Sequence, residues 1–458
     1  MIDTELLRSR TLSLAMRGEL TDRNEADGNA VDLFKRIVEV KKALINKGEI
    51  RKDKKYSDID EIDIPFQIPE NWKWVRFGKI INLQSGQDLK ASDYNDNENG
   101  IPYITGASNY NDDGTLTINR WTNCPKAYAK KDDILLSCKG TVGKLAILKE
   151  DQVHIARQIM GIRTFEVNVL FMFFYIQSMI YGIKEAQKGL IPGIERNDVL
   201  DLLCPLPPLA EQRRIVEKID AIFEILDKID ALQEQYASNQ EALKSKLIDA
   251  AIQGQLTEQL PEDGTAEELL QKIQEEKKEL VKEKKIKKER QMPAISEDDI
   301  PYDIPKSWKW VRLCDISYRI WAGKDKPDDF TKEKDDERMI PVVANGVTDE
   351  GVLGYTSKAT AFKNTITVAG RGTIGFTVYR KYDYCPIVRL IVIEQSKFVE
   401  PRYLQLFLQS MPEASVGSSI PQLTVPMIKP KLVPLPPLDE QIRISDRIYA
   451  LLGIISEK

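Results

Sequence analysis

The sequence predicts an α+β protein in which two mostly-β globular domains are held apart by a long antiparallel helical spacer. Short β-like segments, such as IPYIT at 101–105 and TITVA at 365–369, follow a Trp-x-Trp pair in each half of the chain. After each PLPPL motif, apolar residues recur in alternating steps of four and three, which is the spacing of a coiled-coil seam. The 458 residues suffice for several domains.

The two halves are internal repeats. The matching pairs are IPENWKWVRFGKI and IPKSWKWVRLCDI at 68–80 and 304–316, PLPPLAEQRRI and PLPPLDEQIRI at 205–215 and 434–444, and LRSRTLSLAMRGELT and LKSKLIDAAIQGQLT at 7–21 and 243–257. The last pair makes the start of the chain resemble its middle. We therefore expect a cyclic duplication with a pseudo-twofold axis, cut inside one of its helical parts.

The central helical part begins at the last PLPP proline, Pro208, and Glu211 lies in its first turn, where a negative charge favours the helix dipole. About 40 residues at about 1.5 Å each give a rod of about 60 Å. The expected order is an N-terminal helical segment at 1–60 that completes the distal helical region, a first β-rich domain at 61–208, a central helical region at 209–296, a second β-rich domain at 297–437, and a C-terminal helix at 438–458.

A glycine pattern in the second half has the spacing of a dinucleotide-binding fingerprint, with Gly370, Gly372 and Gly375 as its glycines. A true fingerprint needs a helix after the glycines, but residues 376–379 (FTVY) are β-branched and aromatic. The first repeat has Cys138 where the first glycine should be. The pattern therefore predicts a glycine turn between two strands, and we do not expect nucleotide binding.

Composition excludes several functional classes. The net charge of −5 excludes a uniformly basic nucleic-acid binder but leaves room for local basic surfaces. Five cysteines without a CxxC pair disfavour zinc and disulfide frameworks and fit a reducing cytoplasm. The apolar run at 169–183 is short and predicts a buried helix, not a membrane span. The single histidine, His154, is expected to be structural, and we recognise no metal or methyltransferase motif.

Two lysine-rich tracts accompany the helical repeats. Residues 272–290 hold nine basic and five acidic side chains, and residues 35–55 hold nine basic and three acidic ones. Such tracts are compatible with a solvated helix or hairpin face, and equally with an electrostatic contact to nucleic acid. The sequence leaves both interpretations open.

Two variable β-rich domains, a doubled LPPLxEQ at 206–212 and 435–441, and the cyclic helical repeats together resemble the specificity subunit of type I restriction-modification systems. The resemblance implies that each domain is a target-recognition domain that reads one half of a bipartite double-stranded DNA sequence. It also implies that the helices set the gap and dock two modification subunits, which use S-adenosylmethionine to methylate adenine. Restriction subunits with ATP and Mg²⁺ would join them. The chain itself would hold no cofactor, no metal and no catalytic residue, and would be cytoplasmic.

Polar loop residues near the glycine turns are the candidates for DNA contact, because Arg, Lys, Asn, Gln, Ser and Thr read base edges and phosphates. They are Lys139, Thr141, Lys144, Arg157, Gln158, Lys188, Arg371, Thr373, Arg380, Lys381, Ser418, Ser419 and Gln422. Two other classes remain as alternatives. One is a coiled-coil interaction scaffold with no DNA role, and the other is an enzyme with an unrecognised carboxylate site. Basic surfaces on both globular domains would favour DNA binding, whereas convergent acids in both repeats would favour the enzyme.

Overall fold

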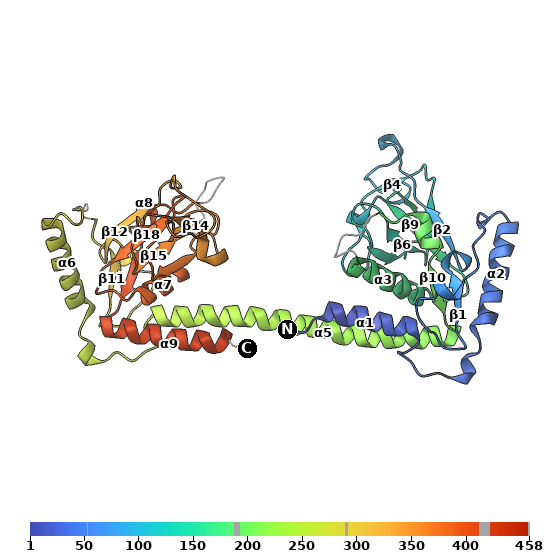
Figure 1. The fold of residues 1–458 in the computed structure, drawn as a ribbon, viewed down its shortest axis with the longest axis horizontal. Helices are drawn as coiled ribbons and strands as arrows, with labels where there is room; N and C mark the ends of the chain where they lie inside the picture. The colour runs from blue at the N-terminus through green and yellow to red at the C-terminus, as the bar shows by residue number, and fades with distance from the viewer. Residues whose placement is uncertain (53, 187–192, 289–291, 412–421, 457–458) are drawn as a thin grey trace. The chain divides into compact units, whose positions relative to one another are not determined.

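The computed structural model describes the whole chain except residues 53, 187–192, 289–291, 412–421 and 457–458 (Figure 1). The chain divides into two compact units, Met1–Glu234 and Gln235–Lys458. The boundary falls within α5 (Leu209–Ile252), so that this 44-residue helix gives its first part to the first unit and the remainder to the second. Each unit is described below by itself.

The first unit combines helices with a β-rich head. Its helices are α1 (Thr4–Arg17), α2 (Ala30–Asn46), α3 (Val169–Ala186), α4 (Arg196–Leu200) and the first part of α5. Its strands are β1 (Lys73–Arg76), β2 (Ile81–Ser85), β3 (Ile101–Ile104), β4 (Trp121–Thr122), β5 (Tyr128–Lys130), β6 (Ile134–Ser137), β7 (Leu145–Ile147), β8 (Gln152–Ile155), β9 (Ile159–Thr164) and β10 (Leu203–Leu206). They form three sheets with the orders β1-β10, β2-β9-β6-β7 and β4-β3-β8-β5.

The second unit repeats this plan. Its helices are the end of α5, α6 (Ala266–Lys282), α7 (Pro401–Ser410), α8 (Val425–Ile428) and α9 (Leu438–Ser456). Its strands are β11 (Lys309–Arg312), β12 (Ser317–Ala322), β13 (Ile340–Val343), β14 (Val352–Thr356), β15 (Thr365–Val368), β16 (Thr377–Arg380), β17 (Cys385–Pro386), β18 (Ile391–Gln395) and β19 (Leu432–Leu435). The sheet orders are β11-β19, β12-β18-β15-β16 and β14-β13-β17. The predicted α+β class with two mostly-β domains is confirmed.

Helix α3 is the buried helix that the apolar run predicts. Phe171, Met172 and Ile176 are fully buried and belong to the main core of the first unit, which also includes strand residues such as Ile134 and Ile162. A continuous apolar surface of this kind favours burial because it removes large side chains from water. Among the described residues, no helix is both long and apolar enough to cross a bilayer.

Each unit contains an antiparallel helical pair. In the first unit, Thr4 at the start of α1 donates to Asp230 of α5, whereas Arg214, nearer the start of α5, pairs with Asp27 beyond the end of α1. In the second unit, α9 lies against the end of α5 in the same sense, and Gln240 Nε2 donates to the Ile455 carbonyl. These contacts agree with the coiled-coil spacing of the sequence.

The repeated PLPPLxEQ motif forms a buried joint between helix and head. In the first unit, Trp72 Nε1 donates to Glu211 Oε2 at 2.8 Å, and Gln212 accepts from the Asn168 backbone before α3. Both motif side chains are fully buried, and Gln212 Nε2 also donates to the Pro207 carbonyl at 2.9 Å. The motif therefore connects the start of β1, a head helix and α5 through buried hydrogen bonds, while Glu211 Oε1 has no partner among the described residues.

The second unit builds the same joint. Trp308 Nε1 donates to Glu440 Oε2 at 2.8 Å, and Gln441 accepts from the Glu400 backbone before α7. Glu440 Oε1 also accepts from Thr257 and Gln259. We call these two buried clusters the first joint (Trp72, Glu211, Gln212) and the second joint (Trp308, Glu440, Gln441).

Candidate nucleic-acid interface

The glycine turn that resembles a nucleotide fingerprint is a β-hairpin turn. Strands β15 and β16 pair antiparallel on either side of it, and β6 and β7 do the same in the first unit. Gly372 and Gly375 adopt φ of 70° and 85°, which is the left-handed region that favours glycine. No helix follows the glycines, so the predicted hairpin is confirmed.

In the first unit, four loops meet beside this turn. They follow the ends of β2, β3, β6 and β8, and we call them together the first loop cluster (residues 86–88, 105–109, 138–144 and 156–158). Backbone bonds join Gly86 to Ile159 and Cys138 to Gln158 at 3.0 and 2.8 Å. A Cβ on Gly106 would lie 2.5 Å from Gln158 Oε1, so the second loop also touches the fourth.

The ring of His154 holds backbone atoms within and beside the first loop cluster in place. Its ring is fully buried, with Nε2 at 2.9 Å from the Gln87 carbonyl and Nδ1 at 2.9 Å from the Ala127 carbonyl. Burial lowers the pKa of the imidazole, because the charged form loses its hydration. The histidine bonds to backbone atoms and has the structural role that the sequence predicts.

Most candidates in the first unit lie in this cluster. Lys139, Thr141 and Arg157 are exposed, whereas Lys144 and Gln158 are half-buried. Arg157 Nε pairs with Asp88 Oδ2 at 2.8 Å, and Lys144 Nζ lies 3.4 Å from Asp112 Oδ1. These exposed ion pairs hold the side chains only weakly, so phosphate groups can compete for the cations. Lys188 lies outside the described residues.

The second unit has an equivalent second loop cluster (residues 323–326, 344–346, 369–376 and 387–390). Asn345 bridges two of these loops, because its Nδ2 donates to the Val388 carbonyl at 2.7 Å and its Oδ1 accepts from the Gly370 amide at 2.8 Å. Arg371 reaches Gln422 at 3.3 Å, and both are exposed, as is Thr373. Ser418 and Ser419 lie outside the described residues.

Two residues that the sequence placed among the contacts do not belong to the second loop cluster. Arg380 is 1% exposed, and its guanidinium bonds Thr367, Tyr382 and the Glu350 backbone inside the head. Contact with DNA would break these buried hydrogen bonds, so this prediction is wrong. Lys381 is exposed but follows the far end of β16, where Arg380 pairs with Thr365, whereas the turn lies at the Val368–Thr377 end.

The structure adds cluster residues that sequence reasoning missed. Lys324 and Arg389 are exposed in the second loop cluster, and Arg389 lies three residues after β17 as Gln158 lies three residues after β8. The aligned segments QIMGI at 158–162 and RLIVI at 389–393 carried this signal. Val388 and Arg389 adopt φ of 51° and 63°, a conformation rare for a β-branched residue. Such strain persists where surrounding structure fixes it, and it gathers at functional sites.

The described residues contain no group of three or more His, Cys, Asp or Glu side chains placed to hold a metal ion. The recognisable features of both clusters are exposed bases, amides and hydroxyls in loops fixed by backbone bonds. This is the chemistry that reads phosphates and base edges.

Comparison with known proteins gives a consistent assignment. The family model described as type I restriction modification DNA specificity domain matches residues 69–235 and 305–458. The chain is 27% identical over 69% of its length to the EcoEI type I restriction enzyme specificity subunit of Escherichia coli, and spans 62% of that protein. It is 24% identical over 97% of its length to the EcoAI specificity subunit of the same organism, spanning 88% of it.

A solved structure supports the fold. One matching chain comes from a structure that describes complex assembly and conformational transition of the type I R-M system. The match covers 86% of this chain and 93% of that chain, with a TM-score of 0.62 at 20% identity. The family model covers both heads, α5 as far as residue 235, and α9. The chain therefore belongs to the type I restriction-modification DNA specificity family.

Proposed function

We propose that this chain is the DNA sequence-recognition subunit of a type I restriction-modification complex, and that each head reads one half of an asymmetric bipartite target. The observation that carries the proposal is the pair of loop clusters, which occupy equivalent places in two equivalent folds but present different side chains. Lys139 in the first cluster corresponds to Arg371 in the second, and Gln87 corresponds to Lys324. Different side chains select different bases, so two unlike half-sites follow.

The helices are proposed to set the gap and to dock two modification subunits. In each unit, α5 exposes two apolar side chains seven residues apart, Ile225 and Leu232 in the first and Tyr236 and Leu243 in the second. Residues seven apart lie on the same helix face, and exposed apolar side chains on one face are typical of protein contacts. The partners would bring S-adenosylmethionine and methylate adenine, and restriction subunits would bring ATP and Mg²⁺. The chain itself would transfer no methyl group.

Methylation mapping with the reconstituted modification subunit tests this function. Four residues inserted into α5 between Ala237 and Ser238 add about 6 Å of helix, which corresponds to about two base pairs. We expect the gap between the methylated half-sites to change while the bases of both half-sites stay the same. As a control, four residues inserted at Gly114, in an exposed turn with open space around it, should leave the gap unchanged. A change in the bases read after the α5 insertion would contradict the proposal.

The scaffold alternative makes the opposite prediction. A two-domain coiled-coil scaffold without a DNA role would leave the pattern of methylated sites unaffected by substitutions in either loop cluster. The family assignment and the exposed bases in both clusters favour DNA recognition.

A further inference from the structure

We propose that a basic groove between α6 and β11 in the second unit binds phosphates of the DNA backbone beside the half-site that the second head reads. We call it the α6 groove, and its lining combines apolar side chains such as Trp310 with the lysines Lys278, Lys282, Lys287 and Lys288. The inference rests on the proposed function and names a contact outside both loop clusters.

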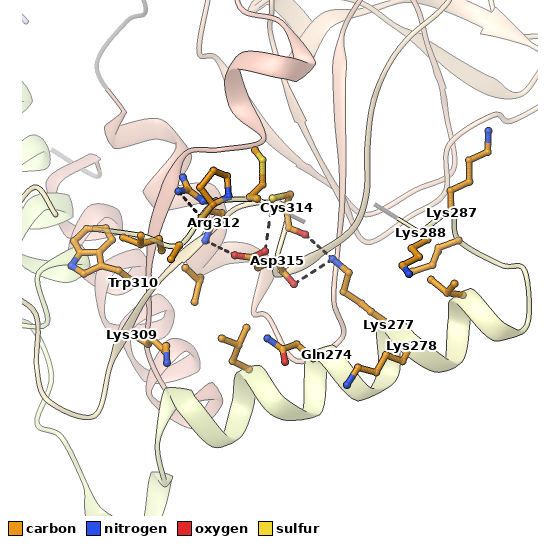
Figure 2. A pocket seen from close by; sticks show the side chains of 18 of the residues that line it. Gln274, Lys277, Lys278, Lys287, Lys288, Lys309, Trp310, Arg312, Cys314 and Asp315 are labelled. Atoms are coloured by element: carbon orange, nitrogen blue, oxygen red, sulfur yellow. Dashed lines mark hydrogen bonds between the residues drawn. The ribbon is translucent and has the colours of Figure 1, made fainter. Parts of the chain in front are cut away.

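The α6 groove is a cavity of about 770 Å³ with a fixed shape (Figure 2). Lys277 of α6 holds the helix against the head, because its Nζ donates to the carbonyl oxygens of Cys314 and Asp315 at 2.7 and 3.4 Å. Arg312 donates to the carbonyl oxygens of Pro430 and Pro293. These two bases are engaged by the protein itself and so build the walls of the groove.

Four other lysines of the groove keep their charge available. Lys278, Lys282, Lys287 and Lys288 are exposed and form no ion pair with any residue in the described part of the chain. Lys278 and Lys282 lie four residues apart on α6 and therefore share one face of the helix. Four like charges around one groove repel one another, and a polyanion relieves that repulsion while it releases its own counterions.

A neighbouring hollow of about 660 Å³ extends from the α6 groove toward the second loop cluster. It shares Lys287 and Lys288 with the groove and reaches Arg319 of β12, whose guanidinium pairs with Glu394. Strand β12 is an edge strand, and Gly323 of the second loop cluster follows its end. Its six residues span about 20 Å, which is the length of about six base pairs of duplex DNA. One DNA backbone can thus reach from the loops to the groove.

The equivalent groove of the first unit has a different charge. Its cavity of about 690 Å³ is also lined by acids, among them Asp58 and Glu70. Its arginine, Arg76, pairs with Asp63 at 3.2 Å. The lysine-rich tract of the first unit, residues 35–55, contributes no lining residue to this cavity, so among the described residues the excess of basic side chains around the cavity is a feature of the second unit. The polyanion that the proposed function supplies is DNA, so we assign the groove to it.

The test replaces Lys278, Lys282, Lys287 and Lys288 together by Gln in the full chain. The matched control replaces Lys130, Lys131, Lys149 and Lys363 by Gln, which removes the same charge elsewhere. These lysines are exposed, form no ion pair among the described residues, and lie away from α5 and from both loop clusters. Binding of a duplex with the mapped target, in the presence of the modification subunit, is measured from low to moderate salt. Each lost phosphate contact lowers the slope of log K against log salt by about 0.9. We expect a loss of about 3 to 4 in the groove variant, little change in the control, and an unchanged target sequence.

The outcomes separate this inference from the proposed function. If the wild-type complex binds no duplex, the proposed function itself fails. If the duplex is bound and the groove variant keeps the slope of the control, the inference is overturned. If the slope is kept but the groove variant no longer binds the modification subunit, the groove takes an acidic protein segment, which also overturns it. Thermal melting of both variants checks that the exposed substitutions leave the fold intact.

Discussion

The two units have the same key side chains in their joints but several different side chains in their loop clusters. In both joints a Trp indole donates to a Glu carboxylate at 2.8 Å, and a Gln accepts from the backbone before a head helix. The loop clusters occupy equivalent places as well, yet Gly106 of the first corresponds to Asn345 of the second. Position is therefore preserved in both regions, but side-chain chemistry is fully preserved in the joints and only partly in the loop clusters, where Thr141 matches Thr373 while Gly106 matches Asn345.

The physical reason lies in burial. Glu211 and Glu440 are fully buried, and a buried polar group that loses its partner costs about 1–3 kcal/mol. An exposed loop side chain such as Arg371 loses little when it changes, because water replaces its partners. The residues that connect each head to its helix are therefore constrained by the stability of the fold. The side chains of the loop clusters can change with little loss of stability, so they can differ according to the ligand that each head binds.

The largest expected effect comes from substitutions that disrupt a joint. Glu440→Ala removes the acceptor of the Trp308 indole and of the Thr257 hydroxyl, whereas Gln259 keeps its bonds to the Gly254 and Thr257 carbonyls, so we expect a loss of about 3 kcal/mol in the stability of the second unit. Glu211→Ala should cost the first unit about 2 kcal/mol, because its main partner is Trp72. Hydrogen exchange resolved along the chain measures each unit separately, and Glu217→Ala, an exposed change on α5, serves as control. Losses no larger than those of the control would refute the shared joint.

A smaller effect concerns the loop clusters. Arg371→Ala should weaken recognition of one half-site by about 1–3 kcal/mol if the guanidinium makes a bidentate base contact. Lys139→Ala should affect only the other half-site. Arg371→Lys is the informative control, because lysine keeps a phosphate contact but cannot reproduce the bidentate geometry. Methylation rates on substituted targets give the answer, and an equal change at both half-sites after Arg371→Ala would refute two independent heads.

The smallest effect is a difference in pH response. Burial lowers the pKa of His154, so the unfolded chain binds its proton more readily than the folded one. Stability of the first unit should therefore be complete above the ordinary histidine pKa and fall as the pH drops through it, from about 7.5 to 5.5. The second unit has Cys385 at the equivalent strand position and no histidine. Hydrogen exchange at both pH values should show the loss in the first unit only, and His154→Gln should remove it.

Sequence patterns predicted the architecture because they are local or repeated. The residues after Gly375 have strand propensity, and this local signal suffices to exclude the nucleotide interpretation. The repeats predicted two similar domains with a helical spacer. The hydrogen bond that Glu211 accepts could not be predicted, because its donor Trp72 lies 139 residues away in the sequence and nothing in the PLPPLxEQ motif indicates this pairing. The sequence explains Glu211 only as a helix-dipole residue.

The same limit explains the errors in the candidate interface. Arg380 has the composition of a surface residue, yet its place in the β15–β16 pairing points its guanidinium into the head, where it bonds Thr367. Asn345 was missed because its two bonds, to Gly370 and Val388, connect loops that are adjacent only in the fold. Arg389 could have been found from its match to the candidate Gln158. Exposure and loop proximity are tertiary properties, and propensity does not encode them.

The continuous helix α5 has a consequence for the order in which the protein forms during synthesis. Every partner in the first joint has left the ribosome once the start of α5 has emerged, so the first unit can fold while the second is still being made. The end of α5 must wait much longer, because Gln240 meets Ile455 only 215 residues later. Until then, its apolar residues Leu247 and Ala251 are not covered by Ile444 and Ile448, so they can bind non-native apolar surfaces. A nascent chain that stalls during synthesis of the second head would therefore contain a folded first head and an α5 helix whose end still exposes apolar side chains. Aggregation is most favoured at this stage.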